Sequence, residues 1–167
     1  MIACMMEVVP VVALYIGNKV KEIKHFVLDD FVPYKLVLTA ERVSSRLAEL
    51  YSKEFGITRP EWRLFAAIGH RKQVIARDLA AISSMDKVKV SRGLQGLEDK
   101  GLIVRTPVPE DQRAALVSLT EAGLTLYRQM VPRVQEWEAS LIDCLSASEY
   151  RDLVSGLDRL LKRLDEI

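Results

Sequence analysis

The chain has 167 residues, about the size of one domain, and 49% of them are hydrophobic, which suffices for a buried core. The 24 Lys and Arg residues nearly balance the 23 Asp and Glu residues, so the net charge of +1 does not by itself indicate a nucleic-acid partner. Two cysteines and two histidines exclude a disulfide framework and a zinc site; we expect no metal or cofactor and a reducing, cytoplasmic compartment.

Residues 1–27 form an N-terminal extension to which the sequence assigns no role. The first 16 residues are mostly apolar, but Glu7 and Pro10 interrupt them, no positive charge precedes them and no small-residue cleavage site follows. This pattern is poor for a signal peptide, and the apolar run is too short to span a bilayer. We therefore expect no contact with a membrane.

Two helices are predicted next. Apolar residues at helical spacing predict a helix over residues 31–55, which Gly56 ends. Thr58 is expected to cap the following helix, with Pro60 early in its first turn, where the missing N–H has no cost. This helix continues to Gly69.

The middle of the chain has the pattern of a helix-turn-helix. A short β-like segment, residues 73–75, precedes a short helix over residues 76–82. A second helix is predicted over residues 86–100 and is stopped by Gly101, a residue typical of helix C-termini.

A β-hairpin is predicted to follow this helix. Residues 102–106 are rich in β-formers, Pro107 and Pro109 bracket a loop, and residues 115–119 alternate between apolar and polar, as a partner strand should. Helix, turn, helix and hairpin in this order is typical of a winged helix. We therefore expect a DNA-binding lobe at about residues 57–119.

Two leucine-rich helices end the chain. Thr120 begins a long helix in which Pro132 should produce a kink, and a capping box over residues 146–149 opens the last helix. Because two antiparallel helices cannot bury both of their apolar faces alone, we expect a homodimer formed through these helices, at about residues 120–167. The predicted fold is mainly α with a small β-hairpin wing: a winged helix-turn-helix flanked by N- and C-terminal helices.

The helix over residues 86–100 should have one buried and one exposed side. At 100° per residue, the buried side carries Val90, Leu94 and Leu97. The exposed side and its flanks carry residues suited to DNA: Lys87, Val88, Lys89, Ser91, Arg92 and Gln95. Arg92 can pair with guanine and Gln95 with adenine, whereas Val88 can touch a thymine methyl group. The lysines and Ser91 suit phosphates, which fix the register of a protein on DNA.

Two glycines lie within this helix. Gly93 falls at the buried edge, where a small residue permits close helix packing. Gly96 is expected to face outward, where it either allows close approach to a DNA groove or is merely tolerated, at about 1 kcal/mol relative to Ala.

The hairpin tip carries a second candidate contact. Residues 71–113 contain nine Lys and Arg and six Asp and Glu residues, a weakly basic region. Asp111 lies two residues before Arg113 and could hold its guanidinium, so that Arg113 could enter the narrow minor groove. The alternative is a solvated turn with an ion pair of little consequence.

Four segments stand in a distinctive order and spacing: LDDFVPYKLVLTAERVS, EWRLF, KVSRGLQGLEDKGLIVR and PEDQRAALVSLTEAG. In combination they resemble the MarR (multiple antibiotic resistance regulator) family of winged-helix transcription factors, over residues 28–167. The resemblance implies that Arg92 and its neighbours read the major groove, and that Asp111 and Arg113, with Gln112 between them, form the wing tip.

The resemblance also implies an obligate homodimer whose N- and C-terminal dimerisation helices lie at about residues 31–55 and 120–167. A two-fold dimer on double-stranded DNA predicts a palindromic operator. We expect a repressor. Many relatives carry a larger or charged residue where Gly96 stands, and often a second Arg where Gln112 stands. We therefore expect weaker DNA binding than in those relatives.

Relatives usually bind a small organic effector, often an aromatic acid, in a cleft between the dimerisation helices and the DNA-binding lobe. The resemblance implies that this cleft is lined from the helices that carry Tyr34, Arg42, Trp62 and Arg63. An aromatic wall with an Arg would suit a carboxylate. The alternative is that Trp62 belongs to the core and that the arginines face solvent.

The residues give little support to three other functions. A thiol-based redox sensor would use Cys4 or Cys144, although Cys144 is expected to be a small core residue. A winged-helix module for protein contact alone should show a more apolar outer face than Arg92, Gln95 and Arg113 provide. An enzyme is not expected, because the sequence has no Ser/His/acid set, Gly-rich phosphate loop or metal cluster.

Overall fold

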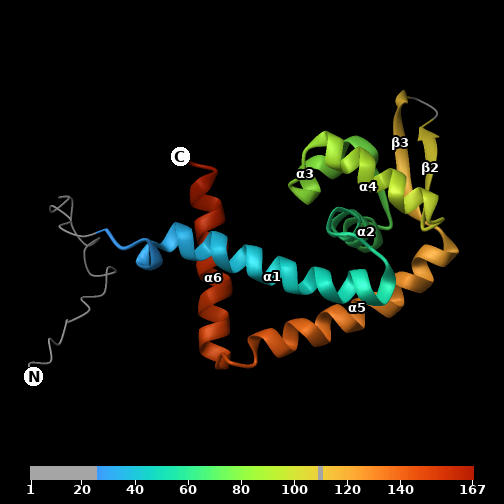
Figure 1. Cartoon of the computed structure of the whole chain (residues 1–167). Helices are drawn as coiled ribbons and strands as arrows, with labels where there is room; N and C mark the ends of the chain where they lie inside the picture. The colour runs from blue at the N-terminus through green and yellow to red at the C-terminus, as the bar shows by residue number, and fades with distance from the viewer. Residues whose placement is uncertain (1–25, 109–110) are drawn as a thin grey trace, which may run out of the picture. The chain divides into compact units, whose positions relative to one another are not determined.

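The computed structural model describes residues 26–108 and 111–167, and for residues 111–113 it describes the backbone only. The elements in chain order are two 3-10 helices, six α-helices and three strands among these residues: η2 (Leu28–Asp30), α1 (Val32–Phe55), α2 (Arg59–Arg71), β1 (Gln73–Ile75), η3 (Ala76–Asp78), α3 (Leu79–Ser83), α4 (Lys87–Asp99), β2 (Ile103–Val108), β3 (Asp111–Leu119), α5 (Glu121–Ile142) and α6 (Ala147–Leu164) (Figure 1). The prediction of a mainly α fold with a small β-hairpin is confirmed.

The chain divides into two compact units, residues 1–45 and residues 46–167, and α1 begins in the first unit and ends in the second. The described part of the first unit consists of η2 and the beginning of α1. Phe26 and Phe31 pack edge to face there, with ring centroids 5.4 Å apart, but both remain exposed. None of the described residues up to Ser45 is buried, so this part of the chain lacks a core of its own.

The sheet of the second unit has the strand order β1-β3-β2, and both pairings are antiparallel. Val117 in the central strand pairs with Val74 of β1 and with Arg105 of β2. The short segment that precedes the helix-turn-helix therefore pairs with β3 and adds a third strand to the sheet of the wing. This arrangement attaches the hairpin to the first helices of the lobe.

The wing strands are longer than the sequence predicted. Pro107 was expected to begin a loop, but it lies within β2 and pairs with Ala115, and β3 begins at Asp111 rather than at residue 115. β2 is an edge strand, the position in a sheet to which proline is usually confined. A bulge between Pro107 and Val108 then shifts the register toward the tip.

The core of the second unit is formed jointly by helices and the central strand, and Figure 1 shows α2, α3 and α4 grouped beside the β2–β3 hairpin. The largest fully buried side chains come from α1, the loop after it, α2, α3, α4, β3 and α5: Tyr51, Ile57, Leu64, Phe65, Ile68, Leu79, Leu97, Val117 and Met130. Full burial of such a side chain stabilises the fold by roughly 1.5–3 kcal/mol. This packing holds α4 against α2 and the sheet, and so gives its outer face a defined direction.

The predicted caps at the starts of α2 and α5 and at the end of α4 are confirmed, whereas α2 ends at Arg71 and not at Gly69. Thr58 and Glu61 form a capping box at α2, with Pro60 in its first turn. Gly101 has φ +67° directly after α4, a conformation that residues with a Cβ rarely adopt. Thr120 caps α5, and α5 continues through Pro132.

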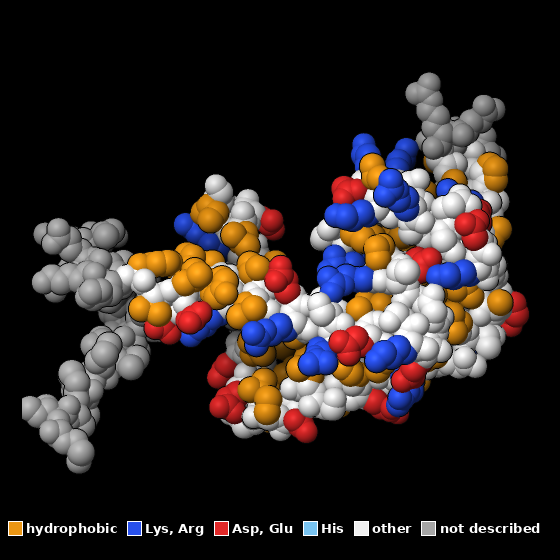
Figure 2. Space-filling view, viewed as in Figure 1, with side chains coloured by type: hydrophobic (Ala, Val, Ile, Leu, Met, Phe, Trp, Pro, Cys, Tyr) orange, Lys and Arg blue, Asp and Glu red, His pale blue; other side chains and the backbone are white. Residues whose placement is uncertain are grey.

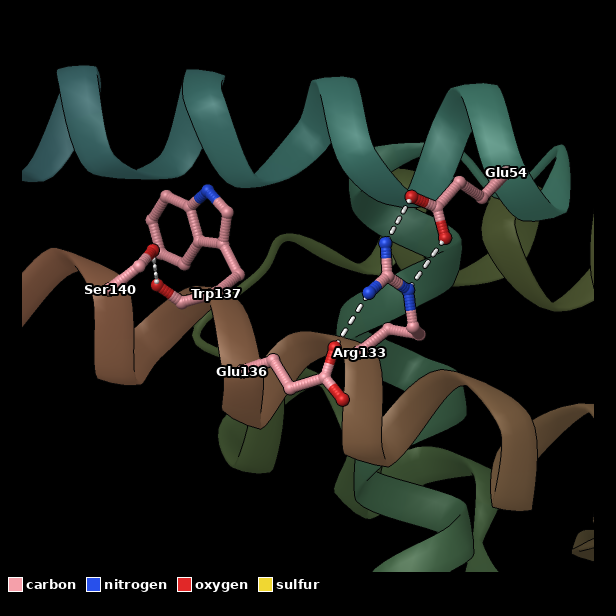
Figure 3. A network of polar contacts seen from close by, with 5 residues as sticks. All are labelled: Glu54, Arg133, Glu136, Trp137 and Ser140. Atoms are coloured by element: carbon pink, nitrogen blue, oxygen red, sulfur yellow. Dashed lines mark hydrogen bonds and ion pairs between the residues drawn. The ribbon is translucent and has the colours of Figure 1, made fainter.

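A charged cluster links the end of α1 to the middle of α5 (Figure 3). The Arg133 guanidinium donates hydrogen bonds to both carboxylate oxygens of Glu54, at 3.1 and 3.0 Å, and one to Glu136 at 2.6 Å. The hydrogen bonds that Arg133 donates to Glu54, followed by the one to Glu136, raise the pKa of Arg133, and the bonds to Glu54 also lower the pKa of that carboxyl group. Because α5 follows the wing directly in sequence, the cluster ties the last turn of α1 to the helix that leaves the lobe.

Among residues 26–108 and 111–167, no helix is both long and apolar enough to cross a membrane.

Candidate nucleic-acid interface

The start of α4 is set by an N-cap. The Asp86 side chain accepts a hydrogen bond from the backbone N–H of Lys89 at 2.8 Å, and its second carboxylate oxygen lies 3.0 Å from Lys89 Nζ. The backbone bond is the main reason why the pKa of Asp86 lies below its ordinary value. The cap places Lys87 and Val88 in the first turn of α4, and both are exposed.

The buried and exposed sides of α4 carry the residues that the helical periodicity predicted for them. Val90, Leu94 and Leu97 are at most 6% exposed, whereas Val88 is 59% exposed. The remaining candidate contacts on this helix are exposed as well: Lys87, Lys89, Ser91, Arg92 and Gln95. Figure 2 shows Lys and Arg side chains gathered over the region of α3 and α4. The helix therefore presents a basic and amide-bearing surface to solvent.

A hydrogen bond within this surface was missed by the sequence reasoning. Gln95 Nε2 donates to Asp99 Oδ1 at 2.8 Å, so the amide of Gln95 is already oriented in the free protein. The spacing of four residues on one helical face was the available signal. Because the amide nitrogen carries two hydrogens, Gln95 can pair with a base through its oxygen and one N–H while the other N–H keeps the bond to Asp99.

The two glycines of α4 differ in what they face. A Cβ at Gly93 would lie 2.7 Å from Leu64 Cδ1, so the expected close packing between α4 and α2 is confirmed. The expectation that Gly96 faces outward was wrong: a Cβ there would collide with Glu61 Oε1 of α2. Gly96 lies on the flank of the helix, where the neighbouring helix and not solvent covers it.

No sequence pattern indicated the ion pair between Glu61 and Lys100, which lies next to Gly96. Glu61 is only 5% exposed, and its Oε2 accepts hydrogen bonds from Lys100 Nζ at 2.6 Å and from the backbone N–H of Thr58 at 2.7 Å. Burial would raise the pKa of Glu61, but the bonds from Lys100 and Thr58 outweigh it and hold the pKa below its ordinary value. Lys100 and Glu61 are 39 residues apart, so no local spacing could indicate the pair.

The wing is connected to α4 by a second ion pair. Arg105 Nη2 of β2 lies 3.1 Å from Glu98 Oε2 of α4. The side chains of Asp111, Gln112 and Arg113 lie outside the described part of the structure, so the proposed hold of Asp111 on Arg113 stays a prediction. The backbone of all three belongs to β3 and not to a loop.

The four candidate effector residues are divided between the two units. Tyr34, half-buried, and Arg42, exposed, belong to the part of α1 that lies in the first unit. Trp62 and Arg63 lie on α2, and Trp62 stacks on Tyr51 with ring centroids 5.6 Å apart. Trp62 is half-buried against the core, and the next residue, Arg63, is exposed.

The expectation that Cys144 is a core residue was wrong. Its side chain is exposed just after α5, with its thiol 3.6 Å from the carbonyl oxygen of Leu141. The helix that precedes it ends two residues earlier, at Ile142, so Cys144 no longer follows the apolar face of α5. Cys4 lies outside the described residues.

Comparison with known proteins identifies this arrangement. A family model described as "MarR family" matches residues 55–114, the segment from the end of α1 into β3. The helix-turn-helix-type transcriptional regulator YdcH of Bacillus subtilis (strain 168) is 32% identical over 113 residues, which are 65% of this chain and 76% of that protein.

Solved structures of MarR-family proteins have the same fold as this chain. A MarR/EmrR family transcriptional regulator from Acinetobacter sp. ADP1 superposes with a TM-score of 0.77 at 25% identity, covering 85% of this chain and 100% of the other. A single-residue mutant of MarR from E. coli, crystallised with operator DNA, gives a TM-score of 0.68 at 27% identity, covering 84% of this chain and 99% of the other. The chain therefore belongs to the MarR family of winged helix-turn-helix proteins, which are DNA-binding transcriptional regulators and not enzymes.

Proposed function

We propose that this protein is a homodimeric repressor that reads a palindromic operator with α4 and is released from it by a small organic effector. The observation that carries the proposal is the exposed face of α4, where Val88, Arg92 and Gln95 stand opposite the buried Val90 and Leu97. Arg92 and Gln95 supply the donor and acceptor groups that distinguish base pairs in the major groove.

The proposed DNA-binding surface has two parts. On α4, Arg92, Gln95 and Val88 read bases, while Lys87, Lys89 and Ser91 hold phosphates. On the wing, Asp111, Gln112 and Arg113 follow the β2–β3 turn, and Arg113 enters the adjacent minor groove. Support for the wing contact comes from the sequence and from the backbone of β3, which extends to Asp111 and so carries these residues to the end of the hairpin.

The homodimer is supported by the composition of α6. Seven apolar residues of this helix repeat at intervals of three and four, and at 100° per residue they fall within about 120° of its circumference. They are Tyr150, Leu153, Val154, Leu157, Leu160, Leu161 and Leu164, which we call the α6 stripe, and each is between 37% and 65% exposed in the single chain. A row this long is typical of a helix that packs against another helix, and a second copy of the chain supplies one.

The proposed effector is an aromatic carboxylate that binds beside Trp62 and Arg63, and Tyr34 and Arg42 stay the candidates that the family resemblance implies on α1. The half-buried indole offers an aromatic surface and Arg63 offers a guanidinium that can bind a carboxylate. Such an effector must favour a dimer whose recognition helices do not match the operator. Binding of effector and DNA must then weaken one another reciprocally.

The experiment that tests DNA reading is selection of bound duplexes from a random library by the wild type and by Arg92→Ala. We expect the wild type to enrich a palindromic sequence. The variant should bind it more weakly by about 1–3 kcal/mol and lose the preference at one base pair in each half-site.

Lys53→Ala is the matched control, because it removes one positive charge from an exposed position on α1. It should keep the base preference of the wild type. An Arg92→Ala variant with the full base preference of the wild type would contradict the assignment of Arg92 to base reading.

A further inference from the structure

Lys100, the residue directly after α4, takes part in a network of three hydrogen bonds with the first turn of α2 and the loop before it. Lys100 Nζ donates to Glu61 Oε2 at 2.6 Å and to the carbonyl oxygen of Gly56 at 2.8 Å. The same oxygen of Glu61 accepts from the backbone N–H of Thr58 at 2.7 Å. One ammonium group therefore connects the end of α4 to both the loop before α2 and the first turn of α2.

Gly96 makes this contact possible. Gly93, Gly96 and Lys100 fall on one flank of α4, the flank that faces α2. The Glu61 carboxylate occupies the space that a Cβ at position 96 would need. The ion pair and the glycine thus form one unit, which we call the Glu61–Lys100 latch.

The latch does not lie on the proposed DNA-reading face. Arg92 and Gln95 are exposed on the face of α4 that adjoins this flank, and Glu61 is almost fully buried. We therefore expect the ion pair to influence DNA reading through the position of the helix. The latch holds the C-terminal end of α4 at a set distance from α2, while Gly93 allows close contact one turn earlier, against Leu64.

We propose that the Glu61–Lys100 latch is a positioning device that sets the angle at which α4 presents Arg92 and Gln95 to the bases. This inference rests on the proposed reading of DNA by α4. Base hydrogen bonds demand placement within about 0.5 Å, whereas flexible lysine contacts to phosphate tolerate a tilt of the helix. Loss of the latch should therefore reduce sequence selectivity more than it reduces general affinity for DNA.

A role in stability alone would have a different consequence. Buried ion pairs often add little to the free energy of folding and can instead specify one arrangement among several. A purely structural pair would change the thermal midpoint and leave the selectivity of the folded protein unaltered. The ratio of affinities for a selected and a scrambled duplex separates the two roles.

The experiment compares the full-length wild type with Gly96→Ala, Lys100→Met, Lys100→Arg and Lys53→Met. Gly96→Ala keeps every charge and inserts a methyl group where the Glu61 carboxylate lies, and Lys100→Met removes the ammonium group but keeps the length of the side chain. Lys100→Arg is the conservative variant. Lys53→Met removes the same charge as Lys100→Met from an exposed site on α1.

The probes are the duplex that the wild type selects from a random library and a scrambled duplex of the same length and composition. We expect Gly96→Ala and Lys100→Met to reduce the ratio of the two affinities by about ten-fold, the loss of roughly one base contact. Gly96→Ala should leave the binding of the scrambled duplex and its salt dependence as in the wild type. Lys100→Arg should recover most of the ratio, and Lys53→Met should keep all of it.

Folded Gly96→Ala and Lys100→Met variants whose ratio stays within two-fold of the wild type would overturn the proposal. If one variant fails to fold, as judged by circular dichroism, the other decides. A wild type that enriches no sequence would overturn the proposed function first, and the positioning role with it. Enrichment by the wild type, followed by unaltered selectivity in the variants, would refute the latch alone.

Discussion

The α6 stripe gives the sharpest test of the homodimer, through the double substitution Leu157→Ala and Leu160→Ala. Both leucines lie in the stripe, and they are 40% and 44% exposed in the single chain. Neither contributes to the buried core of the lobe among the described residues, so truncation should leave the DNA-binding lobe folded. The expected effect is on the association of two chains.

The magnitude follows from the exposed fractions. Full burial of a leucine side chain stabilises by roughly 1.5–3 kcal/mol, and somewhat under half of each side chain remains to be covered, or about 1 kcal/mol per leucine. A two-fold dimer contains four of these side chains, and alanine keeps part of each contact. We expect a loss on the order of 3 kcal/mol, which is roughly a hundred-fold increase in the Kd of the dimer.

The assay is sedimentation equilibrium over a range of protein concentrations, with Arg159→Ala as the control. Arg159 is exposed and lies on the opposite side of α6 from the stripe. The control should dimerise as the wild type does. A double variant with the Kd of the wild type would refute the assignment of the stripe to the dimer, and a monomeric wild type would refute the homodimer itself.

Four further predictions follow from single residues. Gly93→Ala should destabilise the fold in urea by about 1 kcal/mol, because a Cβ 2.7 Å from the buried Leu64 costs more, about 1–3 kcal/mol, than the helix propensity of Ala returns; an increase in stability would contradict the close packing. The pKa of Glu61 lies below its ordinary 4.5, so the ionised carboxylate stabilises the fold above about pH 4.5, and this stabilisation is lost as the pH falls through the lower pKa of the folded state. Glu61→Gln should therefore lose less stability than the wild type between about pH 6 and about pH 3. Identical pH profiles of stability for the two proteins would be evidence against the ion pair. Trp62→Ala should abolish the thermal shift caused by aromatic acids while altering DNA affinity little, and the aromatic proposal fails if no such acid stabilises the wild type. Arg113→Ala should weaken binding mainly at operators with A·T-rich flanks and reduce the slope of log K against log salt by about one, so unaltered binding to both A·T-rich and G·C-rich flanks would remove the wing from the interface.

Much of the local structure could be predicted because its signals are local. Thr58 with Pro60, Gly101 and Thr120 mark helix ends through capping and backbone conformation, and each end lies where these residues indicated. The exposed side of α4 followed from periodicity in the same way, because a helix that buries Val90 and its neighbours must expose the residues half a turn away.

Other features depended on contacts between distant segments. Pro107 suggested a loop, but the pairing of β2 at the sheet edge kept it within a strand. Cys144 follows a leucine-rich helix in sequence, yet the end of α5 leaves it exposed. In both cases the local residue type was a weaker influence than the position of the element at an edge or an end.

Gly96 shows most clearly how local signals differ from contacts between distant segments. The sequence led us to expect Gly96 to face outward, but it lies on the flank of α4, and helical periodicity cannot tell which neighbour covers a flank. The packing of α2 against α4 decides this, by bringing the buried Glu61 carboxylate against Gly96 and within 2.6 Å of Lys100, 39 residues further along the chain. The sequence alone determined the helices, their caps and the outward side chains of α4, because these depend on neighbours within a few residues. Only the folded chain decided how α4 is held against α2, because that depends on the distance between two helices.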